Sequence, residues 1–230
     1  MWTCDERGVL HSELLGQFPW LIHGFGTRLS PDWPGPYTYL KQIHSAIVAI
    51  AEAERGCLGE GDALVTSEPG QIVGIRTADC VPILLADPVR RVVAAVHAGW
   101  RGTVADVVTR TVERMESAAS DLYAAIGPAI GECCFEVGPE VSEKFRSIFP
   151  DRENLRHVHL VEANRRQLLA AGIRESRIES ANRCTVCEAD LLHSYRRDKE
   201  ASGRMVAAIG ILDGDKSKSA GGSPRSARKL

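Results

Sequence analysis

A pair of apolar runs separated by a short polar turn constrains the fold of this chain more than any other feature. Residues 81–86 and 91–97 are rich in Val, Ile, Leu and Ala, and the sequence between them is Asp-Pro-Val-Arg. Proline suits the second position of a type I turn, so residues 87–90 are expected to close a β-hairpin. A helix is expected soon after, with Thr103 as its N-cap and Asp106 at the N3 position of a capping box.

The same patterns predict the other regular elements. Strands are expected over residues 42–50, 71–76, 122–126 and 205–212, and helices over 139–149 and 161–171. One catalytic domain is expected over residues 1–212, followed by a polar, disordered tail over 213–230.

The register of the predicted hairpin brings two potential metal ligands together. With residues 87–90 as the loop, Ala86 faces Arg91, and counting back along both strands places Cys80 opposite His97. Opposite side chains of an antiparallel pair share a face, with Cβ atoms about 4.5 to 5.5 Å apart. That separation suits two ligands that each reach roughly 2.0 to 2.3 Å to one zinc ion.

A third ligand has to come from elsewhere, and His44 is the best placed of the remaining histidines, on the strand predicted over residues 42–50. One Cys and two His leave a fourth tetrahedral position for water or substrate, which is typical of catalytic zinc. The competing interpretation is structural. A Cys in an apolar strand is commonly a small buried hydrophobe, and a single His is commonly a hydrogen-bonded core or surface residue.

Two neighbours of these ligands carry chemistry of their own. Asp79 precedes Cys80 and is a candidate to orient a ligating imidazole or to transfer protons, although an Asp in a turn is most often a local acceptor. Gly99 and Gly102 flank the start of the helix after His97. Backbone amides there, together with Arg101, are candidates to hold phosphate or another anion.

Four of the seven cysteines form a pair, Cys133-Cys134, and a CxxC, Cys184 to Cys187. A second, structural zinc site is not expected from them. Adjacent cysteines point in different directions, and the pair lacks the usual two-residue spacing. Redox chemistry at the CxxC remains an alternative.

Composition narrows the class of partner. The formal net charge of the 230 residues is −2, which gives no basic field for nucleic acid or an anionic membrane. The first residues lack the basic and apolar regions of a secretory signal, so a cytoplasmic location is expected, with the cysteines as thiols or ligands. A monomer that acts on small molecules fits these features.

Short segments spread over residues 23–212 carry a resemblance to a known family. They are Thr77-Ala78-Asp79-Cys80, His97-Ala98-Gly99-Trp100-Arg101-Gly102-Thr103, His23-Gly24-Phe25, Gln42-Ile43-His44, Gly61-Asp62-Ala63-Leu64-Val65-Thr66, Ile126-Gly127-Pro128, Phe135-Glu136-Val137-Gly138 and Ser194-Tyr195-Arg196-Arg197-Asp198. In these segments the chain resembles the YfiH family, also called the laccase-domain, multicopper polyphenol oxidase or peptidoglycan editing factor family. The chain departs from the family in a short connection between Arg28 and Gln42, which puts substrate preference in doubt, and in having Phe135 where many relatives have Tyr.

The resemblance implies a mixed-sheet α/β sandwich similar to the cytotoxic necrotizing factor catalytic domain, and zinc or copper on His44, Cys80 and His97. It also implies phosphorolysis of adenosine, inosine and S-methyl-5'-thioadenosine, with adenosine deamination as a further activity. For these reactions Asp79 is the candidate for proton transfer. The candidates for binding phosphate and substrate are Arg101 first, then Arg28 and Arg196, with Gln42.

Three other functions stay open. An amidase that edits peptidoglycan precursors would use the same metal, or Cys80 as nucleophile with His97 as its partner. A copper-dependent polyphenol oxidase would need a trinuclear cluster with many more histidines than the seven present. A non-catalytic binding module, with the metal only joining the strands of the hairpin, would have a fourth protein donor.

Overall fold

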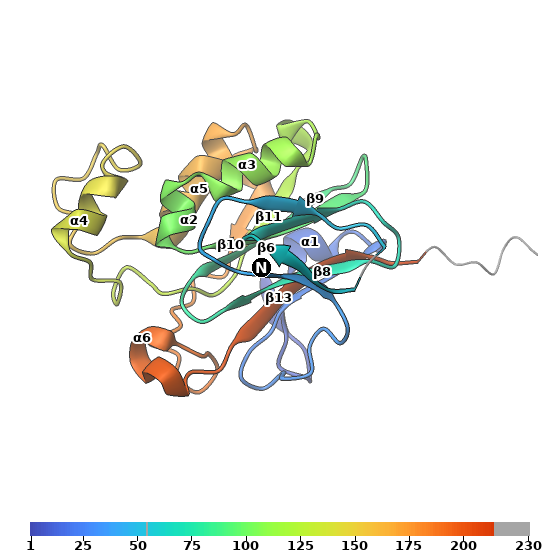
Figure 1. Ribbon diagram of the computed structural model, residues 1–230, viewed down its shortest axis with the longest axis horizontal. Helices are drawn as coiled ribbons and strands as arrows, with labels where there is room; N and C mark the ends of the chain where they lie inside the picture. Colours follow the sequence, from blue (N-terminus) through green and yellow to red (C-terminus); the bar gives the residue numbers. More distant parts are fainter. Residues whose placement is uncertain (54, 214–230) are drawn as a thin grey trace, which may run out of the picture.

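Two mixed β-sheets lie face to face, and helices cover the outer face of one of them (Figure 1). The computed structural model describes residues 1–53 and 55–213. The seven-stranded sheet has the order β1-β2-β3-β13-β8-β4-β6. Its strands are β1 Trp2–Cys4, β2 Leu10–Ser12, β3 Leu21–Phe25, β4 Thr38–Lys41, β6 Gly56–Glu60, β8 Ile72–Thr77 and β13 Met205–Ile211. The expected mixed-sheet α/β sandwich is confirmed.

The six-stranded sheet contains the predicted hairpin at its centre. Its order is β12-β11-β9-β10-β7-β5. The strands are β5 Val48–Ile50, β7 Ala63–Thr66, β9 Val81–Asp87, β10 Val92–Ala98, β11 Tyr123–Ile126 and β12 Ile178–Ser180. The helices are α1 Glu13–Gly16, α2 Trp100–Val104, α3 Val107–Arg114, α4 Pro139–Ser142, α5 Leu160–Ala170 and α6 Tyr195–Asp198. Figure 1 shows α2, α3 and α5 together over the sheet that holds β9 and β10.

The central hairpin is buried on both faces because it lies between the other sheet and the helices. Every residue of β9 and of β10 is buried. Alternate side chains enter two different cores, so Leu84 packs between the sheets whereas Ile83 packs under the helices. A strand enclosed in this way is apolar along its whole length, which explains the continuous runs in the sequence.

The helix after the hairpin begins earlier than predicted and is interrupted. Gly99 is the N-cap of α2, and Thr103 lies inside the helix, where its hydroxyl donates to the Gly99 carbonyl at 3.0 Å. Asp106 has a left-handed backbone, with φ of 60°, and separates α2 from α3. Thr103 as N-cap and Asp106 at N3 were therefore wrong, since the chain turns into helix directly at the end of β10.

Two further predicted elements are shorter in the structure. The strand expected over residues 42–50 is limited to β5, and the helix expected over 139–149 is limited to α4 followed by the 3₁₀ turn Glu143–Phe145. The tail predicted over residues 213–230 lies, apart from Asp213, outside the described residues. Among the described residues, no helix is long and apolar enough to cross a membrane.

Replacing Leu84 should test the inter-sheet core. Leu84 is fully buried, so Leu84→Ala leaves a cavity and is expected to lower the free energy of unfolding by about 2 to 5 kcal/mol. Val89, in the hairpin loop, is 73% exposed, and Val89→Ala should change stability by no more than about 0.5 kcal/mol. Urea unfolding followed by circular dichroism measures both, and equal losses would contradict this packing.

Candidate metal centre

The three predicted ligands come together at one end of the central hairpin. Cys80 directly precedes β9, His97 is the penultimate residue of β10, and His44 lies in the loop between β4 and β5. Their ligand atoms all lie within 4.8 Å of one another. The Cys80 sulfur is 3.9 Å from His44 Nε2, and the two imidazole rings have centroids 5.0 Å apart. Two imidazoles and one thiol thus face a common point.

The hairpin register differs from the prediction by two residues. His97 pairs with Pro82 and Val92 pairs with Asp87, so the loop is Pro88 to Arg91 and Cys80 lies beyond the end of β9. Asp87 belongs to the strand, and its carboxylate accepts hydrogen bonds from the loop amides of Val89 and Arg90. Because side chains alternate with a period of two, a shift of two residues keeps Cys80 and His97 on the same face. The predicted direct pairing was wrong, but the two side chains still converge.

His44 is positioned by a buried carboxylate rather than by a strand. Asp62 is fully buried, and its carboxylate accepts hydrogen bonds from the backbone amides of Ile43, His44 and Ser45, at 3.0 Å for His44. It also accepts a hydrogen bond of 2.7 Å from the Ser45 hydroxyl. The loop bends at His44, whose φ is 59°. This bend directs an exposed imidazole toward Cys80 and His97.

The same carboxylate fixes His97. His97 Nδ1 lies 2.8 Å from Asp62 Oδ1, and both side chains are almost completely buried. Burial alone would lower the pKa of His97, but the bonds to Asp62 and Cys80 raise it to about 9. Burial alone would raise the pKa of Asp62, yet the His97 and Ser45 hydrogen bonds hold it below its usual value. With Nδ1 engaged, Nε2 is the nitrogen available to a metal, a common arrangement of ligating histidines.

Cys80 lies in surroundings that favour its thiolate. Burial would raise its pKa, but interactions with His44 and His97 lower it to about 6. Space for the sulfur depends on Gly99. A Cβ at Gly99 would lie 2.9 Å from the Cys80 sulfur and 3.0 Å from His44 Cδ2, closer than side-chain carbons pack.

This donor set fits a transition-metal ion. A thiolate with two imidazoles suits zinc or copper better than magnesium or calcium. Among the described residues, the cluster consists of His44, Cys80 and His97 alone, so a tetrahedral ion held there would keep one position for another ligand.

Asp79 was predicted as a candidate to orient a ligating imidazole, but in the structure Asp62 contacts the His97 ring instead. The Asp79 carboxylate accepts hydrogen bonds from the Thr185 hydroxyl and from the backbone amide of Arg196, both at 2.6 Å. Asp79 therefore ties the segment before Cys80 to the chain near α6. A role for Asp79 in proton transfer stays a prediction.

The predicted phosphate and substrate contacts lie in separate places. Arg101 is exposed and stacks over the Trp100 ring, 4.3 Å from its centroid. Arg28 donates to the Ala189 carbonyl, and Arg196 donates to the carbonyls of Cys134 and Glu136. Gln42 exchanges two hydrogen bonds of 2.8 Å with the backbone of Arg76. Within this group, Arg101 alone lies on the segment that carries His97.

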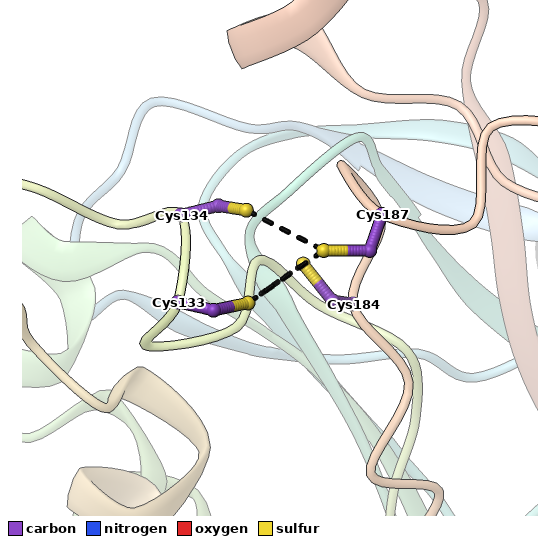
Figure 2. Close-up of side chains that lie close together, drawn as sticks. All are labelled: Cys133, Cys134, Cys184 and Cys187. Carbon is purple, nitrogen blue, oxygen red and sulfur yellow. Dashed lines mark hydrogen bonds between the residues drawn. The ribbon is translucent and has the colours of Figure 1, made fainter.

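Four of the six cysteines outside this centre form a second cluster, contrary to the prediction. Cys133, Cys134, Cys184 and Cys187 have sulfur atoms that all lie within 4.8 Å of one another (Figure 2). Adjacent cysteines diverge on an extended chain, but these two lie on a turn. In that turn, the amides of Cys134 and Phe135 both donate to the Gly131 carbonyl at 3.0 Å. Adjacency and the lack of the usual two-residue spacing therefore do not keep the four sulfur atoms apart.

Asp62 was missed as a functional residue by sequence reasoning. The available signal was an acidic residue after Gly61 and directly before the apolar run of residues 63–66. A carboxylate beside a buried strand needs several hydrogen-bond donors. Its donors are distant in sequence, so the pattern alone could not identify them.

Comparisons with known proteins agree with this architecture. The sequence profile of the family described as multi-copper polyphenol oxidoreductase laccase matches residues 29–212. A purine nucleoside phosphorylase from Deinococcus radiodurans is 42% identical over 183 residues, covering 76% of this chain and 70% of the relative. Adenosine deaminase RL5, from an unknown prokaryotic organism, is 38% identical over 190 residues, covering 74% of this chain and 72% of the relative. The crystal structure of YlmD from Geobacillus stearothermophilus superposes with a TM-score of 0.82 at 31% identity, covering 92% of this chain and 99% of that one.

Asp62→Asn should weaken zinc binding at this centre while leaving its three ligands in place. The substitution removes the charge that holds the His97 ring and disturbs the amides around His44, and losses of this kind typically cost about 10- to 100-fold in metal affinity. Competition titration against a chromophoric chelator measures the change. Asp32→Asn, at an exposed position, is the matched control and should bind zinc as the unaltered protein does. Equal affinities in the two variants would contradict the role given to Asp62.

Proposed function

This chain belongs to the YfiH family, and on that basis we propose that it is a zinc-dependent purine nucleoside phosphorylase that also deaminates adenosine. The proposed substrates are adenosine, inosine and S-methyl-5'-thioadenosine, together with phosphate. The coarser statement, an enzyme resembling purine nucleoside phosphorylases, follows from the relatives themselves. The observation that carries the proposal is the convergence of His44, Cys80 and His97 at the end of the hairpin.

In the proposed site, His44, Cys80 and His97 hold the metal. When bound, a zinc ion would supply Lewis acidity to a substrate oxygen or to water. Asp62 holds the His97 ring and the His44 loop, so the ligand atoms are arranged before the ion arrives. Such preorganisation lowers the cost of reorganisation during the reaction.

The polar residues around the ligands have distinct proposed roles. Asp79 is the candidate for proton transfer because it directly precedes Cys80 and its carboxylate is fixed by the Thr185 hydroxyl and the Arg196 amide. Arg101 is the first candidate for phosphate binding, because it is exposed and lies in the sequence shortly after Gly99, at the start of α2. The guanidinium groups of Arg28 and Arg196 already donate to backbone carbonyls, so they rank after Arg101.

A second candidate function is supported by the state of Cys80. Its pKa of about 6 beside a histidine with a pKa of about 9 is the arrangement of a nucleophilic thiolate with an imidazolium partner. This pair would suit an amidase acting on peptidoglycan precursors. A polyphenol oxidase is disfavoured by the donors, because the metal-capable clusters among the described residues contain only two histidines.

Cys80→Ala should abolish most of the phosphorylase activity. Loss of one of the three ligands should reduce the conversion of inosine and phosphate to hypoxanthine and ribose 1-phosphate by about 100-fold or more. Chromatographic quantification of both products gives the rate, and zinc content is measured on the same samples. Cys57→Ala, at an exposed cysteine outside both clusters, is the control and should keep full activity.

The proposal is rejected if unaltered protein with zinc forms neither ribose 1-phosphate from inosine nor inosine from adenosine. It is also rejected if Cys80→Ala leaves both rates unchanged. Release of an amino acid from serine-containing muropeptide precursors, in the absence of either purine reaction, would instead support the amidase.

Arg101→Gln should separate the two purine reactions. If Arg101 binds phosphate, its loss removes a charge-assisted hydrogen bond worth about 1.5 to 3 kcal/mol, so kcat/KM for phosphate should fall about 10- to 100-fold. Adenosine deamination needs no phosphate and should be nearly unchanged. Arg110→Gln, at an exposed arginine of α3, is the control. Parallel loss of both activities in Arg101→Gln would contradict a specific role in phosphate binding.

A further inference from the structure

We propose that Cys133, Cys134, Cys184 and Cys187 bind a second zinc ion as four thiolates, in a structural site separate from the centre at Cys80. The cluster contains no residue of that centre, and its four donors leave no position for a substrate. The proposal does not depend on which reaction the enzyme catalyses.

The distances between the sulfur atoms match those of a tetrahedral site. Cys133 Sγ lies 3.7 Å from the sulfur atoms of both Cys184 and Cys187, and Cys134 Sγ lies 3.5 Å from that of Cys187. Zinc–sulfur bonds of about 2.3 Å in a tetrahedron place the sulfur atoms about 3.8 Å apart. In Figure 2 the four side chains point toward one another from two separate loops. One zinc ion can therefore reach all four with little rearrangement.

Backbone amides donate to one of the four sulfur atoms, that of Cys184. The amide of Gly131 donates to Cys184 Sγ at 3.2 Å. The amides of Cys187 and Val186 also donate to the Cys184 sulfur. Amide donors directed at a cysteine sulfur are the kind of outer contact that orients metal ligands and stabilises their charge. The CxxC turn supplies two of these three amides itself.

Positive charge lies beside the cluster. Arg197 Nη1 donates to the carbonyls of Thr185 and Val186, within the CxxC turn. Arg196 Nη1 donates to the carbonyl of Cys134 at 3.1 Å. Zinc bound by four thiolates carries a net double negative charge. The guanidinium group of Arg196 would offset part of this charge, whereas that of Arg197 is already paired with the Asp198 carboxylate.

The ion would join two loops that contain little regular structure. The loop after β11 and the loop before α6 form one isolated β-bridge, between Ala129 and Cys184, where Thr185 donates its amide to the Ala129 carbonyl at 3.0 Å. Ala129, Ile130 and Phe135 are buried in the core under the helices, whereas two of the four cysteines are exposed and lie outside it. A closed tetrathiolate site would supply the missing cross-link.

The joined loops also reach the centre at Cys80. Thr185, inside the CxxC, donates its hydroxyl to Asp79, the residue before Cys80. Arg196 donates its amide to the same carboxylate, and its side chain contacts Cys134. The second zinc would therefore help to fix the position of Asp79 through Thr185 and Arg196, without taking part in the reaction.

Zinc analysis of the full-length protein, purified under reducing conditions, tests this proposal. The unaltered chain should hold two zinc ions, and Cys80→Ala should keep one. The double variant Cys184→Ser/Cys187→Ser should lose one, whereas the control Cys57→Ser should keep both. X-ray absorption of Cys80→Ala, which retains all four cysteines of the cluster, should show four sulfur neighbours at about 2.3 Å.

Three results would overturn the proposal. The first is Cys80→Ala protein that binds no zinc after loading, and the second is a zinc environment in that variant with nitrogen or oxygen in place of the sulfur neighbours. The third is disulfide bonds among the four cysteines in protein kept under reducing conditions, detected by mass spectrometry. If the double variant fails to fold, the measurements on Cys80→Ala decide the question alone.

Discussion

The buried carboxylate of Asp62 is the constraint on which the candidate centre depends. It lies directly before β7 and receives hydrogen bonds from three successive loop amides and from the His97 ring. A charged group without exposure to water must be saturated with donors, and here the donors include the His44 amide and the His97 ring, which belong to two of the three proposed ligands. Satisfying one buried charge therefore sets the positions of His44 and His97 together. Cys80, directly before β9, then needs only to lie on the same face of the hairpin as His97.

The parts of the fold that the sequence could predict are those with long, uninterrupted apolar patterns. Strands β8, β9, β10, β11 and β13 and helix α5 lie within one or two residues of their predicted limits. The short strands of the first sixty residues were largely missed, because three or four residues carry too little periodicity. The break at Asp106 was also invisible, since a left-handed residue between two helical segments leaves no clear pattern.

The convergence of the three candidate ligands could be predicted from the sequence, but the contacts that bring them together could not. His44, Cys80 and His97 were identified from residue type and from a hairpin register that was wrong by two, an error that preserves the face of a strand. The contacts of Asp62 and the meeting of the four cysteines depend on loops far apart in sequence. Local spacing carries no information about such contacts. The adjacent cysteines were expected to point in different directions, but the turn that follows Gly131 brings both of their sulfur atoms to the cluster.

The enclosure of β10 between two layers has a consequence for how the centre opens. His97 belongs to a strand with every residue buried, so its amide hydrogen should exchange with solvent only through large-scale unfolding. His44 lies on an exposed loop held by a few hydrogen bonds to one carboxylate, and that loop can detach in a much smaller fluctuation. The rates at which an ion enters and leaves would then be set by the opening of this one loop, while the hairpin keeps its structure.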